Sequence, residues 1–123
     1  MLATSNRLRS ADDFRRCLRA GGRSGGPLVV VHLLVPDSAL DGTAGAAVAA
    51  PRVGFVVSRA VGTAVTRNLV KRRLRHLVRE RLADLPAGSL VVVRAQPPAA
   101  TASYAELRSE LERCLQRCLR KVA

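Results

Sequence analysis

One segment constrains the fold of this chain more than any other, the stretch from Val61 to Arg79. At 100° per residue, its apolar side chains fall on one face of a helix, and they are Val70, Leu74, Leu77 and Val78. The opposite face is polar and cationic, and it carries Asn68, Lys71, Arg72, Arg75 and Arg79. The segment therefore predicts a helix that buries one side against a sheet and presents dense positive charge on the other.

The chain as a whole also carries a large excess of positive charge. The 123 residues carry a formal net charge of +12, and no acidic residue occurs between Asp41 and Glu80. An ordinary solvated helix face interleaves Glu with Lys or Arg and gains stabilising pairs, which this one lacks. Uncompensated charge on a small domain indicates a polyanionic partner, with a simple solubility role as the alternative.

Turn and cap signals divide the rest of the chain into elements. Ser10 to Asp13 is typical of a helix start, and strands are expected at 28–35, 52–58 and 90–94. The basic helix begins after Thr63 and runs to about Leu82, and a second capping box at Ser103 opens a terminal helix. The order α-β-β-α-β-α predicts an α+β fold, a small mixed sheet packed with helices and possibly one extra short strand. Residues 1–123 are expected to form a single domain with a flexible loop at 36–51, and a right-handed crossover is the default between 52 and 94.

The sequence offers little for protein-borne catalysis. Its two histidines, His32 and His76, fall on different predicted elements, and no Asp/Glu pair follows a strand. Cys17, Cys114 and Cys118 form no metal-binding pair and are interpreted as buried thiols. The chain is expected to have no catalytic or metal site of its own and no small-molecule substrate. With no apolar run long enough to cross a bilayer and no signal peptide, it is expected to be cytoplasmic and to bind no membrane.

The basic segment and the strand before it resemble a known family. Arg52-Val53-Gly54-Phe55-Val56-Val57-Ser58-Arg59, followed by Arg67-Asn68 and Lys71-Arg72, is similar to the signature of the protein component of bacterial ribonuclease P. The likeness extends from Asn6-Arg7-Leu8 to the helix that opens at Tyr104, and so covers nearly the whole chain. Three positions depart from the pattern, since Leu69 replaces an Arg, Ala60 replaces a Lys, and Leu18 replaces a second aromatic residue.

The resemblance implies a function. The family's protein assists a catalytic RNA that removes the 5′ leader of precursor tRNA with Mg²⁺ bound through the RNA, so the protein is an accessory subunit and binds no cofactor itself. It also implies a left-handed crossover in place of the default. The residues implied to bind the catalytic RNA are Arg59, Arg67, Asn68, Lys71, Arg72, Arg75 and Arg79. Those implied to line the cleft for the leader are Phe14, Leu18, His32, Ser58 and Arg67.

Alternatives stay open for single residues and for the whole chain. Phe14 and His32 are equally typical of core side chains, although both rings can stack on a base. A ribosomal-type or general RNA-binding protein is the main alternative function, and a DNA-binding basic protein is a more distant one.

Overall fold

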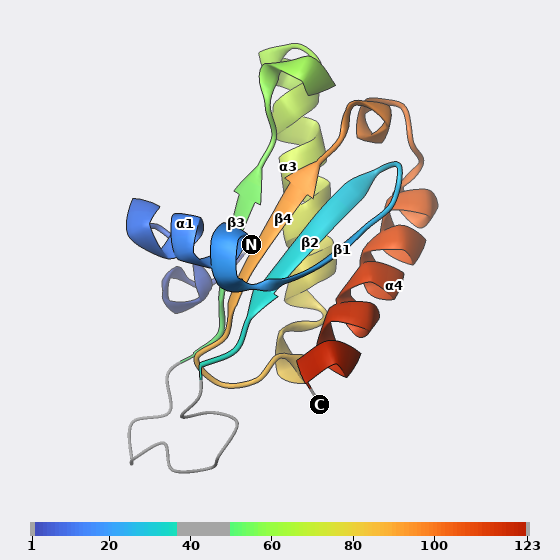
Figure 1. The fold of residues 1–123 in the computed structure, drawn as a ribbon. Helices are drawn as coiled ribbons and strands as arrows, with labels where there is room; N and C mark the ends of the chain where they lie inside the picture. Colours follow the sequence, from blue (N-terminus) through green and yellow to red (C-terminus); the bar gives the residue numbers. More distant parts are fainter. Residues whose placement is uncertain (1, 37–49, 123) are drawn as a thin grey trace.

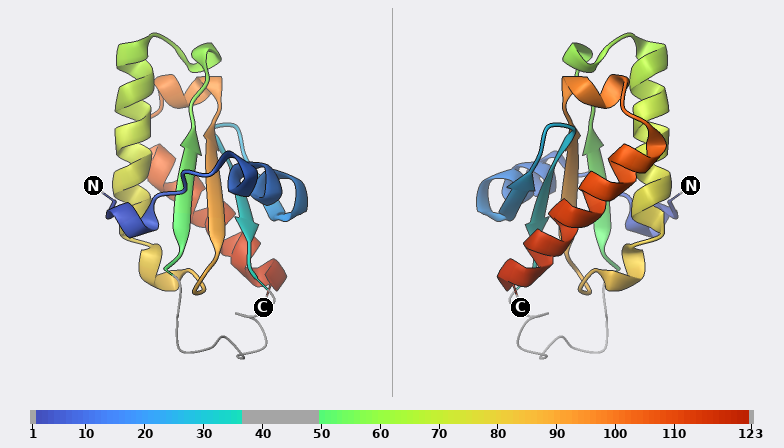
Figure 2. Two further views of the ribbon diagram at one scale, coloured as in Figure 1. Left: turned by 90° about the vertical axis from the view of Figure 1, so that its left-hand side faces the viewer. Right: turned by 90° about the vertical axis from the view of Figure 1, so that its right-hand side faces the viewer.

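The computed structural model describes residues 2–36 and 50–122, which form one four-stranded sheet with helices on both faces (Figure 1). The sheet order is β1-β2-β4-β3, built from β1 (Gly22–Gly25), β2 (Val29–Leu34), β4 (Leu90–Ala95) and β3 (Arg52–Val56). β2 runs antiparallel to both β1 and β4, whereas β3 and β4 are parallel. Helices α3 (Ala64–Arg79) and α4 (Tyr104–Val122) cover one face, and α1 (Ala11–Ala20) lies on the other (Figure 2).

The connection between β3 and β4 is a left-handed crossover. In Figure 1 both strands point upward, β4 lies to the right of β3, and the intervening α3 passes behind the sheet. A right-handed path would place α3 in front, on the side of α1. The default expectation of a right-handed crossover is therefore wrong here, and the uncommon left-handed arrangement implied by the resemblance is found instead.

Alternate side chains of the strands build two cores. Towards α3 and α4, Val29, Val31 and Leu33 of β2 pack in the larger core, together with the apolar face of α3. Towards α1, Cys17 and Val92 belong to a smaller core. The Cys17 thiol lies 3.3 Å from the Leu90 carbonyl oxygen, and burial raises its pKa to about 11.

The helix starts follow the predicted caps. The Ser10 and Thr63 hydroxyls accept from the backbone amides of Asp13 and Thr66, at the starts of α1 and α3. Ser103 and Glu106 bond each other's backbone amides before α4, as a capping box requires.

Two predicted elements, the basic helix and the second strand, end earlier than expected. α3 stops at Arg79 and is followed by a separate 3-10 turn, Leu82–Asp84, while β3 stops at Val56. The possible extra strand is β1, a Gly-Arg-Ser-Gly segment whose two glycines give little strand propensity. The remaining 3-10 turns are Thr4–Asn6, Arg59–Val61 and Pro97–Ala100. Most of the loop predicted at 36–51 lies outside the described residues.

Candidate nucleic-acid interface

The outer face of α3 carries positive charge that no nearby carboxylate compensates in the described residues. The apolar face of α3 is buried as predicted, and it consists of Val70, Leu74, Leu77 and Val78. The opposite face of the helix therefore points towards solvent. Asn68, Arg72 and Arg79 are exposed, whereas Lys71 and Arg75 are half-buried. Within residues 2–36 and 50–122, no carboxylate oxygen lies within 4.0 Å of a cationic nitrogen in the following set: Arg59, Arg67, Lys71, Arg72, Arg75 and Arg79.

The acidic residues near α3 gather at its far end and along α4. His76 lies 3.6 Å from Glu80, and Arg81 pairs with Glu112 of α4. Arg73 donates to the Ala102 carbonyl oxygen at 3.4 Å and so also turns towards α4. Charge compensation is thus confined to the junction of α3 and α4, and the rest of α3 remains able to bind anions.

A pocket of about 260 Å³ lies where α1, β3, α3 and the N-terminal segment meet. Four cationic side chains and several apolar ones line it, and the full set is Leu2, Arg7, Leu8, Arg9, Phe14, Val53, Gly54, Phe55, Lys71 and Arg75. The N-terminal segment is held in place because the Leu8 amide donates to the Val53 carbonyl oxygen at 3.0 Å. Arg7 pairs with Val53 in a parallel bridge, which brings the two N-terminal arginines beside α3.

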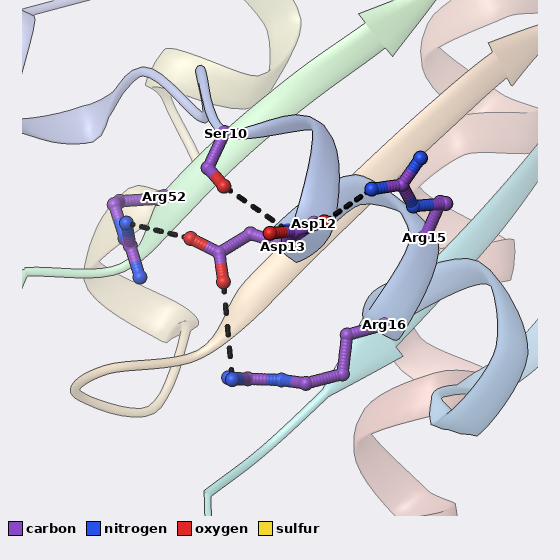
Figure 3. A network of polar contacts seen from close by, with 6 residues as sticks. All are labelled: Ser10, Asp12, Asp13, Arg15, Arg16 and Arg52. Atoms are coloured by element: carbon purple, nitrogen blue, oxygen red, sulfur yellow. Dashed lines mark hydrogen bonds and ion pairs between the residues drawn. The ribbon is translucent and has the colours of Figure 1, made fainter.

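A polar network fixes the first turn of α1 beside this pocket (Figure 3). Asp13 lies 3.2 Å from Arg52 of β3 and 3.8 Å from Arg16, while Arg15 pairs with Asp12. The Asp13–Arg52 contact crosses from helix to strand, so it sets the position of the neighbouring residue, Phe14.

Phe14 approaches the sheet closely because residue 54 is a glycine. A Cβ atom at position 54 would overlap the Phe14 ring. An isolated glycine within a strand indicates a close approach by another group, so Gly54 is the sequence signal for this contact. The pocket also contains four side chains that no sequence pattern predicted, because their contacts depend on segments distant in sequence: Leu2, Leu8, Val53 and Phe55.

The predicted leader-binding residues do not all meet in the pocket. Of these five, only Phe14 lines it, with Lys71 and Arg75 from the predicted RNA-binding set. Leu18 is exposed on α1, beside Arg19. Ser58 is exposed after β3, and Arg67 is half-buried with its Nε enclosed.

The His32 side chain is buried in the protein interior. It is 4% exposed, and both ring nitrogens are buried without a hydrogen-bond partner among the described residues. Burial lowers the pKa of its imidazole, and the nearby cations Arg94 and Arg23 lower it further. Burial beside two cations favours the neutral imidazole, and a contact between His32 and a leader base remains a prediction.

The described residues contain neither a metal-binding cluster nor a membrane-spanning helix. No group of three or more His, Cys, Asp or Glu side chains is placed to hold a metal ion in residues 2–36 and 50–122. None of the helices in this part of the chain combines the length and apolarity needed to cross a bilayer.

Comparison with known proteins identifies the family. The sequence model described as Ribonuclease P matches residues 2–119. The chain belongs to the ribonuclease P protein family. The ribonuclease P protein component of Streptomyces griseus is 58% identical, over 97% of this chain and 96% of the relative. That of a Nocardioides species is 55% identical, over 95% and 94% of the two chains.

Solved structures support the same fold. The ribonuclease P protein of Staphylococcus aureus has a TM-score of 0.75 at 24% identity, covering 90% of this chain and 93% of the other. The ribonuclease P protein of Thermotoga maritima has a TM-score of 0.69 at 24% identity, covering 93% and 96%. As a ribonuclease P protein, the chain is a component of a tRNA-processing ribonucleoprotein, and its partner in that complex is RNA. Family membership thus favours this assignment over the ribosomal-type and general RNA-binding alternatives.

Proposed function

We propose that this ribonuclease P protein binds the catalytic RNA through the outer face of α3 and holds the 5′ leader of precursor tRNA in the adjoining pocket. The RNA, with Mg²⁺, cleaves the phosphodiester bond in the cytoplasm, and the protein is an accessory subunit that binds no cofactor. The observation that carries this proposal is the pocket itself, where Phe14 meets four cations directly beside a cationic helix face.

The α3 face suits RNA irrespective of base sequence. Arg and Lys side chains bind phosphate by charge, and the guanidinium fork of Arg adds paired hydrogen bonds. Because no carboxylate competes for Arg72, Arg75 or Arg79 within the described residues, phosphates are their available partners. About six phosphate contacts would make log K fall against log salt with a slope of roughly −4 to −5.

The pocket suits a single strand of variable sequence. The Phe14 ring offers a surface for stacking, which contributes about 1–3 kcal/mol per base and tolerates any base. Arg7 and Arg9 from the N-terminal segment line the same pocket as Lys71 and Arg75 from α3, so a bound strand would meet cations from two segments of the chain. Leu18 and Ser58 do not line the pocket and remain predicted leader contacts outside it.

The protein's contribution to cleavage is electrostatic and positional. Cations beside the RNA offset phosphate repulsion, so the RNA should need less Mg²⁺ to fold and to bind its substrate. Leader binding adds affinity that mature tRNA cannot obtain, and the complex should therefore prefer the precursor over the product.

A reconstitution tests both parts of the proposal. Precursor tRNA and the catalytic RNA are incubated at low Mg²⁺ with and without this chain, and initial cleavage rates are measured. We expect the wild-type protein to accelerate cleavage, whereas K71Q/R72Q/R75Q should do so only at higher protein concentration. Acceleration that is equally strong with the triple variant, or cleavage by the protein alone, would contradict the proposal.

A second assay isolates the pocket. Phe14→Ala should reduce the preference of the holoenzyme for precursor over leaderless tRNA by roughly 5- to 150-fold, the equivalent of one lost stacking contact. Arg15→Gln, the next residue on α1 and already paired with Asp12, is the matched control and should keep the preference. An unchanged preference in Phe14→Ala would remove Phe14 from the leader site.

A further inference from the structure

A second cationic surface lies on the side of the molecule opposite to β3. Four basic residues of α4 recur at helical spacing on its flank next to β1, and Arg23 of β1 adjoins them because the Lys121 ammonium donates to its carbonyl oxygen at 2.5 Å. All five side chains are exposed. We refer to this set as the β1-side cationic surface: Arg23, Arg113, Arg117, Arg120 and Lys121.

Few carboxylates lie near this surface, so most of its positive charge is uncompensated. Only Arg113 has one nearby, at 3.4 Å from Glu110, and the Glu110 side chain already accepts from the Leu28 and Val29 amides at 2.6 Å. Across residues 2–36 and 50–122, the other four members have no carboxylate oxygen within 4.0 Å.

The other flank of α4 shows the contrast. There Glu112 pairs with Arg108 of its own helix and with Arg81 beyond α3. On the α3 side of α4 the charged groups are therefore paired, whereas on the β1 side Arg113 alone among the cations has a carboxylate within 4.0 Å in the described residues.

Helix electrostatics explain only part of this arrangement. Cations in the last turn are favoured by the helix dipole, which accounts for Arg120 and Lys121. Arg113 and Arg117 lie earlier in α4, Arg23 is on a strand, and the i,i+4 spacing of Arg113, Arg117 and Lys121 places like charges side by side. Such pairs cost a few tenths of a kcal/mol each, so an external polyanion is the natural counterpart.

This surface is separate from the leader pocket. β1 and β3 are the two edges of the sheet, three strand intervals or about 14 Å apart, and the pocket lies at the β3 edge. We propose that the β1-side cationic surface binds the phosphate backbone of a second segment of the RNA subunit, so that the protein spans two segments of that RNA. This inference rests on the proposed binding of the RNA subunit through α3.

Salt-dependent binding of the full chain to the RNA subunit, transcribed from the genome that encodes this chain, tests the inference. Each lost phosphate contact should reduce the log–log slope by about 0.7–0.9, so R117Q/R120Q/K121Q should reduce it by about 2–3 and weaken binding tenfold or more at moderate salt. The control R15Q/R16Q/R108Q removes the same formal charge from residues that already have carboxylate partners, and it should keep the wild-type slope.

The variants are chosen so that folding and the proposed function are tested separately. R23Q/R117Q lies outside the last turn of α4 and should reduce the slope by about 1.5, with Tm and circular dichroism showing that the fold is kept. The precursor preference over leaderless tRNA should not change in either variant, because the leader pocket is intact. If K71Q/R72Q/R75Q also has no effect on RNA binding, the proposed function fails.

Two outcomes would overturn the inference alone. One is a wild-type slope in R117Q/R120Q/K121Q while the α3 variant loses binding. The other is unchanged RNA binding with loss of adsorption to vesicles containing anionic phospholipid, which would assign the surface to a membrane.

Discussion

At the scale of single residues, Gly54 decides how deep the Phe14 ring lies. Gly54→Ala places a methyl group inside the ring's volume, so either Phe14 or β3 must move. We expect a loss of about 1–3 kcal/mol in the free energy of unfolding, measured by urea denaturation, together with weaker leader preference. Gly22→Ala is the matched control, since its new Cβ would lie 3.8 Å from the nearest atom, the Leu33 carbonyl oxygen. Equal stability of the two variants would show that the ring has room to move.

His32 gives the fold a pH dependence of predictable sign. Because its pKa in the folded chain is lowered from 6.5, the unfolded chain binds more protons near that pH. Stability contributed by neutral His32 is present above about pH 6.5 and is lost as the pH falls below it. The Glu106 and Glu112 pKa values are lowered from 4.5, by hydrogen bonds from Ser103 and Arg81 respectively, so their effects lie at lower pH.

The variant His32→Phe tests this assignment. It keeps an aromatic ring and removes two unpartnered nitrogens, so its free energy of unfolding should vary less between pH 5 and 7 than that of the wild type. Urea denaturation at several pH values measures the difference. A pH profile identical to that of the wild type would mean that another group titrates in this range.

At the scale of elements, local signals predicted α1, α3 and α4 well because caps and apolar periodicity act within a few residues. Ser10, Thr63 and Ser103 each cap the helix that their position indicates. β1 was predicted only as a possible extra strand, because the segment is rich in glycine and has little strand propensity of its own. Its pairing with β2 stabilises it as a strand. The handedness of the crossover is likewise set by packing across the whole sheet, and only the family resemblance indicated it.

One buried carboxylate reinforces the packing of α4 against the β1–β2 hairpin. Glu110 is 5% exposed and accepts from two successive amides, Leu28 and Val29, at 2.6 Å each. Glu110→Ala leaves both donors without this partner and should cost roughly 2–4 kcal/mol in the free energy of unfolding. Ser109→Ala, at an exposed neighbouring position, should stay within about 0.5 kcal/mol of the wild type. If both variants are equally stable in urea, water satisfies the two amides as well as the carboxylate does.

At the scale of the whole molecule, the net charge could be read from the sequence, but the distribution of that charge over the surface could not. The α3 face was predictable from its spacing, whereas the pocket was not, because Arg7 and Arg9 reach Lys71 and Arg75 only through pairing of the N-terminal segment with β3. Of the predicted leader contacts, Phe14 lies in that pocket and His32 does not. The structure thus places two largely uncompensated cationic surfaces towards opposite edges of one sheet, while ion pairs occupy the first turn of α1 and the junction of α3 with α4.

This distribution makes the stability of the free protein depend on anions. With a net charge of +12, binding of sulfate or phosphate to the folded state should stabilise it, by about 2.7 kcal/mol when the anion is present at 100 times its Kd. Melting in sodium chloride and in sodium sulfate at equal ionic strength should therefore give a Tm several degrees higher in sulfate. Sulfate also favours compact states in general through exclusion from protein surfaces, so the comparison needs K71Q/R72Q/R75Q. The general effect persists in that variant, while the part due to binding at α3 is lost. A sulfate-induced rise in Tm that is the same in wild type and variant would show that α3 binds no anion in the free protein.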